Sequence, residues 1–531
     1  MSHASFKPER GDVECLYGYG YRLGDGVTPD LCTDHGAKVK LFPSFYVEAP
    51  RRPVQVSLGP IVPGLTLPMP DTFHGPTLLE GAKARFARNP PTTDKNLMRG
   101  LSAFVEDFVT RNFTPIPANE DVSVERWLAE NTTYTKTRKA ELQRLWDSNQ
   151  RKITPIDYLV KTFTKTENYP CYKHARAINS RSDMAKCFFG PFFHLIEKVV
   201  YAYPAFIKHV PVRERPRYIL TMLGKYSGPF METDYSQFES HFVPDVMNSL
   251  EMILYRYMLQ NFPHVMKHIE SAMTGMNRCT SRHFLLKVLG RRMSGEMCTS
   301  LGNGFSNLML ASYAAHLKGG GIEGVVEGDD GLFYCTKDIG TDDFSRLGFR
   351  IKMKIHDDLL QSSFCGLVMS RDLQTMTSPI PTVISFGWTH SPLMLCGPKI
   401  RQQLLRAKAL SLAYEHPRCP ILSALALTVL RHTAGVKPRH DTGWYSRHLV
   451  EEVQKFKEET ESLLAEGPSL QTRIDFARLY QISIPEQLSV ERELFEWRGG
   501  PLGPRVVQLC RRTHPDVRHY DLNYVRGSRR Y

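Results

Sequence analysis

The chain has 531 residues, of which 42% are hydrophobic and 11% aromatic, so it can form more than one hydrophobic core. Its net charge of +13 favours a polyanionic partner such as nucleic acid. The cysteines are scattered without a Cys-x-x-Cys pair, which argues against a zinc site or a disulfide framework, and no apolar stretch is long enough to predict a membrane span.

The N-terminal part is rich in proline and glycine. The segment from Pro50 to Pro70 contains six prolines, which predicts an extended strap lying over a surface. Helical periodicity is present over residues 101–109 and 124–148. The stretch 162–181 is polar and basic with little periodicity, and a helix is expected after it over 192–203.

Short strands and longer helices alternate in the middle of the chain, and the C-terminal part is mostly helical. Strands are expected over 230–233, 325–327 and 349–355, and helices over 243–260, 304–318, 402–414 and 422–432.

The tripeptide Gly328-Asp329-Asp330 lies between two strand-like runs, 324–327 and 331–335. Glycine and aspartate favour a two-residue hairpin loop, so the two carboxylates are expected at its tip. Adjacent unpaired carboxylates usually require a divalent cation to neutralise them. The tripeptide alone is a weak signal, and its neighbours decide its meaning.

A second acidic candidate, Asp234, ends the strand-like run that begins at Phe230, and Ser236 is expected to cap the first turn of a following helix. An aspartate in such a place is usually a cap or a turn residue. Phosphoryl transfer with two metals, however, needs at least two bridging carboxylates. Together with Asp329, Asp234 is therefore a candidate metal ligand.

Between these two acidic segments, residues 294–303 predict a loop that enters a helix. Thr299 and Asn303 are four residues apart and so lie on one helical face. Small polar side chains there can recognise a ribose hydroxyl, because asparagine offers both a donor and an acceptor.

These three segments, in this order, resemble motifs A, B and C of viral RNA-dependent RNA polymerases of positive-strand RNA viruses, in particular of the tombusvirus-like group. Residues 163–167 and 174–182 upstream are similar to the basic finger motif F, and residues 363–366 downstream to motif E. The resemblance implies an α/β (α+β) right-hand polymerase with fingers, a palm of antiparallel strands and helices, and a helical thumb. The implied division is a strap and fingers over 1–225, a palm over 226–251 and 293–378, a fingers insertion over 252–292 and a thumb over 379–531, with the proline-rich strap joining fingers to thumb.

The resemblance also implies the catalytic residues. Asp234 and Asp329 would be the principal ligands of two Mg²⁺ ions, for which Mn²⁺ is a substitute, and Asp330 would support them or ligate more weakly. Lys352, or as second choice Lys354, would donate a proton to the departing pyrophosphate. An exposed strand face explains these lysines almost equally well.

Two further groups are implied for the nucleoside triphosphate (NTP). Four cations of motif F would line the channel through which the NTP enters: Lys165, Lys173, Arg176 and Arg181. Glu167 would form an ion pair with one of them. Ribose selection would fall to Ser294, Thr299 and Asn303 with Glu239, where the commonest family pattern has an aspartate instead.

Two other classes of protein share some of these features. A reverse transcriptase usually has an aromatic residue two positions before its aspartate pair, where this chain has Glu327. A basic RNA-binding packaging protein suits the composition, but the acidic residues Asp234, Asp329 and Asp330 would repel RNA. The expected partners are an RNA template and product strand, NTPs, and other viral or host replication proteins. The expected place is the host-cell cytoplasm, on membrane-associated complexes reached through a partner.

Overall fold

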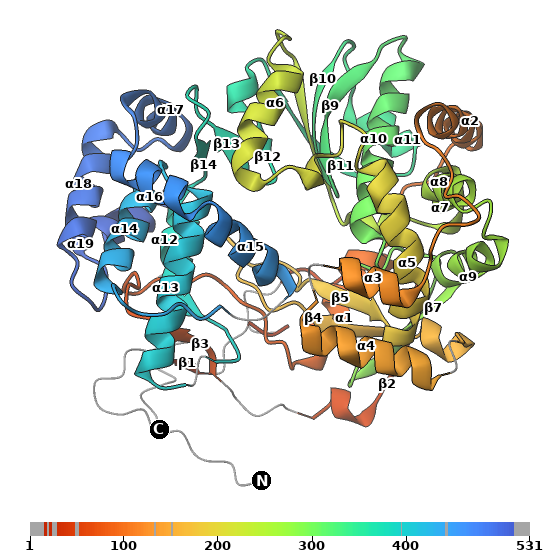
Figure 1. Cartoon of the computed structure of the whole chain (residues 1–531), viewed down its shortest axis with the longest axis horizontal. Coiled ribbons are helices and arrows are strands. Elements are labelled where there is room, and N and C mark those ends of the chain that lie inside the picture. The colour runs from red at the N-terminus through yellow and green to blue at the C-terminus, as the bar shows by residue number, and fades with distance from the viewer. Residues whose placement is uncertain are drawn as a thin grey trace.

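The computed structural model describes residues 15–17, 21–23, 29–47, 53–131, 134–149, 152–393, 396–440 and 444–513. The chain is 50% helix and 14% strand, which confirms the mixed α/β class. Figure 1 shows a helical C-terminal region on one side, a central sheet with its helices on the other, and a second large sheet below that one. Among the described residues, no helix has the length and apolar character to span a membrane.

The central sheet has the strand order β11-β6-β10-β9, with all neighbours antiparallel. Both of its faces are covered, by α10 (Thr299–Leu317) on one and α6 (Arg215–Leu223) on the other. This explains the continuous apolar runs in these strands, where Val325 and Val326 are buried on opposite faces. The strands are β6 (Phe230–Tyr235), β9 (Ile322–Glu327), β10 (Asp330–Cys335) and β11 (Ile351–His356).

Residues 207–223 pack on the central sheet. Two local expectations differ in this region. The helix expected over 243–260 is two helices, α7 (Pro244–Ser249) and α8 (Glu251–Met258), because the backbone leaves the helical conformation at Leu250. Ser236 caps no helix: a left-handed residue, Gln237, follows it and starts a 3-10 turn instead. The adjoining elements are η4 (Ile207–His209), η5 (Val212–Glu214), η6 (Phe238–His241), α11 (Thr341–Arg346), η7 (Leu359–Gln361), β12 (Ser363–Phe364), β13 (Leu367–Met369) and β14 (Thr375–Met376).

A five-stranded sheet has the order β2-β8-β7-β4-β5. The stretch 162–181, expected to be irregular, contributes two antiparallel strands to it, so that expectation was wrong at both of its ends. One face of the sheet packs against α1 (Gly75–Ala82) and the π-helical turn η2 (Lys83–Ala87). The strands are β2 (Lys38–Leu41), β4 (Val160–Thr164), β5 (Ala177–Arg181), β7 (Met276–Thr280) and β8 (Phe284–Leu289).

A layer of helices connects the two sheets. Its members are α2 (Lys95–Asn112), α3 (Val124–Glu130), α4 (Lys136–Ser148), η3 (Pro155–Tyr158), α5 (Asp183–Val200) and α9 (Pro263–Met273). Helices α2, α5 and α9 bury their apolar faces in one large core together with α10, and α3 and α4 pack against α5 in a smaller core.

The C-terminal region is a helical cluster with its own core. Its two clearest sequence patterns, over 402–414 and 422–432, are helices as expected. The elements are α12 (Pro379–Phe386), β15 (Trp388–Thr389), α13 (Pro398–Glu415), α14 (Leu422–His432), α15 (Trp444–Lys455), α16 (Lys457–Glu466), α17 (Leu470–Tyr480), α18 (Ile484–Glu496) and α19 (Pro504–Arg511).

The proline-rich segment bridges the C-terminal helices and the five-stranded sheet. Its strand β3 (Pro53–Ser57) pairs with β15 and with β1 (Cys15–Tyr17), and Leu65 is buried in the C-terminal core. A few residues later, the Pro68 carbonyl accepts a hydrogen bond from Tyr169 N at 2.8 Å, in the loop between β4 and β5. A short 3-10 turn, η1 (Pro43–Phe45), lies earlier in the chain.

Candidate active site

Three strands of the central sheet place one basic and two acidic residues in a row. Asp234 on β6 lies directly across from Lys352 on β11. On the other side of β6, Thr233 pairs with Gly331 of β10, so the next residues along, Asp234 and Asp330, also face each other. Residues directly opposite in antiparallel strands share a face and lie about 5 Å apart.

Asp329 lies in the tight turn between β9 and β10. Glu327 pairs with Asp330, which leaves Gly328 and Asp329 as a two-residue loop, as the sequence predicts. Gly328 has φ of +61°, a conformation that glycine adopts without strain, and glycine at the first loop position is typical of a type II′ hairpin. The turn therefore presents Asp329 beside the two strand-borne aspartates.

Within the described residues, none of these three carboxylates forms an ion pair. Burial, and the carboxylates of Asp329 and Asp234 in addition, raise the pKa of Asp330 to about 7. Desolvation by the surrounding protein also raises the pKa of Asp329, and the charge of Glu239 raises it further. The Asp329 side chain nevertheless stays open to solvent. Such mutual repulsion is what a bound cation relieves.

The donor set suits Mg²⁺ bound together with substrate. No preassembled cage of three or more His, Cys, Asp or Glu side chains is present among the residues that the structure describes. Mg²⁺ usually binds through one or two carboxylates, with waters and substrate phosphates completing its octahedral shell. Asp234, Asp329 and Asp330 offer the hard oxygen ligands that this arrangement needs.

Asn307 on α10 holds the turn in place. Its Nδ2 donates to the Asp329 carbonyl at 3.1 Å, and its Oδ1 accepts from the Tyr235 hydroxyl at 3.2 Å. Gly331 permits this approach, because a Cβ there would lie 2.9 Å from Asn307 Nδ2 and 2.6 Å from Thr233 Oγ1. Asn307 was not among the predicted site residues, although it lies one helical turn after Asn303 on the same face.

The two candidate lysines of β11 differ in their contacts. Lys354 forms an ion pair with Glu232 at 3.0 Å, whereas Lys352 is exposed and forms no ion pair with any described residue. The register therefore favours Lys352 as the group available to a substrate beside Asp234.

The candidates for ribose selection differ in whether their side chains already form hydrogen bonds within the protein. Ser294 Oγ donates to the Ala177 carbonyl at 3.1 Å, and Thr299 Oγ1 donates to the carbonyls of Met293 and Glu296, each at 3.0 Å. Asn303 is 4% exposed, and its Oδ1 has no hydrogen-bond partner among the described residues. A buried unpaired amide oxygen is costly, so Asn303 is the member of this group that is set to bind a ligand hydroxyl.

The Glu239 carboxylate forms an ion pair with Arg85, which was not among the predicted site residues. Its Oε1 accepts from Arg85 Nη2 at 2.7 Å, so within the described residues the carboxylate pairs with Arg85 rather than with Asn303. Burial alone would raise the pKa of Glu239, but the Arg85 guanidinium outweighs burial and holds the pKa below its usual range. Arg85 also has Nε and Nη1 buried without a hydrogen-bond partner in the part of the chain that the structure describes.

Three cations of the predicted entry channel, Lys165, Lys173 and Arg176, lie in the loop between β4 and β5. Glu167 pairs with Lys165 at 2.6 Å and with Arg176 at 3.3 Å, which confirms the expected role of Glu167 in holding this loop. Lys173 lies over the Tyr169 ring at 4.5 Å, and burial lowers its pKa.

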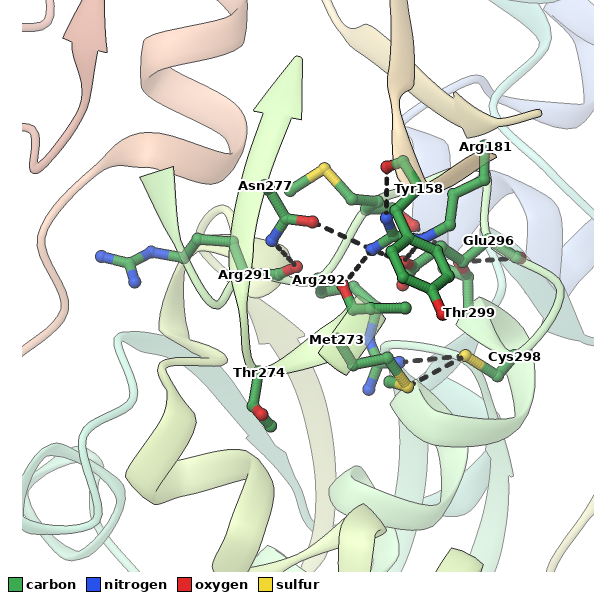
Figure 2. Close-up of polar contacts among 12 residues, drawn as sticks. Tyr158, Arg181, Met273, Thr274, Asn277, Arg291, Arg292, Glu296, Cys298 and Thr299 are labelled. Atoms are coloured by element: carbon green, nitrogen blue, oxygen red, sulfur yellow. Dashed lines mark hydrogen bonds and ion pairs between the residues drawn. The ribbon is translucent and has the colours of Figure 1, made fainter. Parts of the chain in front are cut away.

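Arg181 differs from the other three, because its side chain is buried and its donors are taken up by neighbouring groups. Its guanidinium donates to Glu296, to the backbone carbonyls of Tyr158 and Ala272, and to Asn277 Oδ1 (Figure 2). The side chains of Arg181 and Glu296 are 6% and 5% exposed. With its donors directed into the interior, Arg181 ties β5 to the loop before α10.

Comparison with known proteins agrees with this geometry. A family model described as viral RNA dependent RNA polymerase matches residues 87–374, more than half of the chain. The chain therefore belongs to this family and is an RNA-directed RNA polymerase, a nucleotidyltransferase that takes an RNA template and NTPs. Viral polymerases of this kind generally use divalent metal ions. A search of curated proteins gave no match.

Proposed function

We propose that this polymerase copies viral RNA from ribonucleoside triphosphates by two-metal phosphoryl transfer, for both genome replication and transcription. The observation that carries the proposal is the row of Lys352, Asp234 and Asp330, with Asp329 in the adjoining turn. Asp234 and Asp329 would hold two Mg²⁺ ions, with support from Asp330. When bound, these ions would supply the positive charge that activates the primer hydroxyl and stabilises the pyrophosphate.

The other residues of the site position the substrate. Lys165, Lys173 and Arg176 neutralise the triphosphate as it enters, and Arg176 suits this task through its bidentate guanidinium. Asn303 accepts a hydrogen bond from the ribose through its free Oδ1, and the Arg85–Glu239 pair fixes the neighbouring surface. Lys352 donates a proton to the departing pyrophosphate.

The sheet and helix contacts also support a division into fingers, palm and thumb. The central sheet is the palm, the five-stranded sheet belongs to the fingers, the C-terminal helical cluster is the thumb, and the proline-rich segment is the strap between fingers and thumb. We propose further that the enzyme acts in the host-cell cytoplasm and reaches membrane-bound replication complexes through a partner.

The test is the Asp234→Asn variant beside the wild type. We expect the variant to lose ribonucleotide incorporation on an RNA template while it keeps RNA binding and thermal stability. Asp234 is solvent-exposed, so its replacement by an isosteric amide costs little folding energy. Incorporation at the wild-type rate by this variant would exclude Asp234 as a metal ligand.

A further inference from the structure

The outward face of the five-stranded sheet carries exposed cations and no acidic side chain. None of its five strands contains Asp or Glu. Because strand residues alternate between faces, Cys279, Leu286 and Val288 pack against α1, and the cations reach solvent on the other face. Two apolar side chains, Met276 and Leu289, share that outward face and are 57% and 52% exposed. The exposed cations are Lys38 and Lys40 on β2, Lys161 on β4, Arg278 on β7 and Lys287 on β8.

Three of these cations form one row across adjacent strands. Lys38 pairs in register with Lys287, and Lys287 with Arg278. Neighbouring strands lie about 4.8 Å apart, so the Cα atoms of these three residues fall within about 10 Å. Like charges directly opposite one another destabilise a sheet. None of the three has an ion-pair partner within the part of the chain that the structure describes.

Protection of a sheet edge does not explain this row. Lysines on an edge strand prevent unwanted pairing with another chain, which accounts for Lys38 and Lys40 on the edge strand β2. Lys287 and Arg278, however, lie on the inner strands β8 and β7, which have neighbours on both sides. The repulsion within this row therefore lowers the stability of the sheet without protecting its edge. A bound polyanion would offset that repulsion.

An exposed aromatic ring on the same face favours single-stranded RNA as this polyanion. Phe163 is 42% exposed and lies two residues after Lys161, beside Ile178 of β5. Proteins that bind single strands combine a cationic track with aromatic rings on which bases stack. The chain continues from Phe163 to Lys165, so this face adjoins the cations proposed for the NTP channel.

We propose that the outward face of the five-stranded sheet is a second RNA-binding surface, which holds single-stranded RNA outside the active site. The phosphates lie along the row of Lys38, Lys287 and Arg278, and a base stacks on Phe163. The inference extends the proposed function, since it takes RNA as the substrate, but binding to this face is measurable without any synthesis.

The test compares two triple variants of the full chain. In the first, Lys38, Arg278 and Lys287 are replaced by glutamine. In the matched control, three other exposed lysines without an ion-pair partner in the described region are replaced by glutamine: Lys136, Lys267 and Lys337. Both variants lose the same charge. Binding of a 20-nucleotide single-stranded RNA is measured by fluorescence anisotropy between 50 and 200 mM salt.

For the first variant we expect affinity at low salt to fall at least about tenfold, and the slope of log K against log salt to become shallower by about 2. Its melting temperature should equal or exceed that of the wild type, because repulsion is relieved. Phe163→Ala should lower affinity about fivefold or more. The rate of nucleotide incorporation by this triple variant should equal the wild-type rate on a template just long enough to fill the active site. If the wild type itself incorporates no nucleotide on that template, the result contradicts the proposed function but not RNA binding to this face.

The proposal is overturned if both triple variants bind the RNA alike. It is also overturned if the first variant binds single-stranded RNA normally and instead loses binding to a perfect duplex, or to vesicles of phosphatidylserine, because the face would then serve a different ligand.

Discussion

Arg85 Nη2 and Glu239 Oε1 lie 2.7 Å apart and join the π-helical turn η2 to the segment that follows Asp234. The two side chains are 14% and 10% exposed, so the pair is largely shielded from water. This contact gives the longer Glu239, where the family pattern usually has aspartate, a fixed position beside Asp329.

Loss of Arg85 should therefore damage both stability and substrate choice. Arg85→Ala leaves the Glu239 carboxylate buried without its partner, at a cost of about 3–5 kcal/mol. The double variant Arg85→Ala/Glu239→Gln should recover part of this cost, because the uncompensated charge is removed. Thermal unfolding measures the stability, and kcat/KM for ATP and dATP measures the selectivity. Unchanged selectivity in the folded double variant would contradict the positioning role.

The ion pair of Arg181 and Glu296 predicts a different outcome. Arg181→Ala should destabilise the protein by about 3–5 kcal/mol, because Glu296 would remain buried and unpaired, whereas replacing both residues by methionine should cost far less. A folded double variant should keep the wild-type KM for NTPs. A large rise in the KM of this double variant would instead support a role for Arg181 in the entry channel.

The lysines of β11 provide a matched comparison. Lys352→Ala should lower the single-turnover rate of nucleotide addition about 100-fold, the lower range for loss of a general acid. Lys354→Ala should change it little, because Lys354 already pairs with Glu232. The rate is measured by rapid quench at saturating NTP. Equal rates for the two variants would exclude Lys352 as the proton donor.

The carboxyl of Asp330 predicts a pH dependence. Its pKa is about 7 in the metal-free protein and near 4 in an unfolded chain. The folded state thus holds the extra proton between about pH 4 and 7, so metal-free stability should fall as pH rises through this window. Mg²⁺ requires the ionised form, so it should raise the melting temperature more at pH 8 than at pH 6. Asp330→Asn should abolish this difference. A shift of equal size at both pH values in the wild type would contradict the assignment.

The acidic centre was predictable because its signals are local. Glycine and aspartate between two strand-like runs specify a two-residue turn, and Asp234 ends an apolar strand that must enter the core. That these segments meet in one sheet follows from their resemblance to the polymerase motifs. What they do not specify is the register, which alone places Lys352 rather than Lys354 opposite Asp234.

Arg85 could not be predicted in the same way. It is 154 residues from Glu239 in the chain and lies in a π-helical turn with no motif of its own, so the contact depends wholly on tertiary packing. Arg181 is a different case. Its segment alternates, with Ala177, Asn179 and Arg181 on the buried face, and recognising β5 as a strand would have placed this arginine in the interior.

The most direct test of the proposed metal site is ribonucleotide incorporation on a homopolymeric RNA template with Mg²⁺, comparing wild type with Asp329→Ala. The turn is held by Gly328 and by the Asp329 backbone contact to Asn307, so the variant should fold and bind RNA as the wild type does. We predict incorporation by the wild type and none by the variant. Incorporation by both at similar rates would contradict a catalytic centre at Asp329.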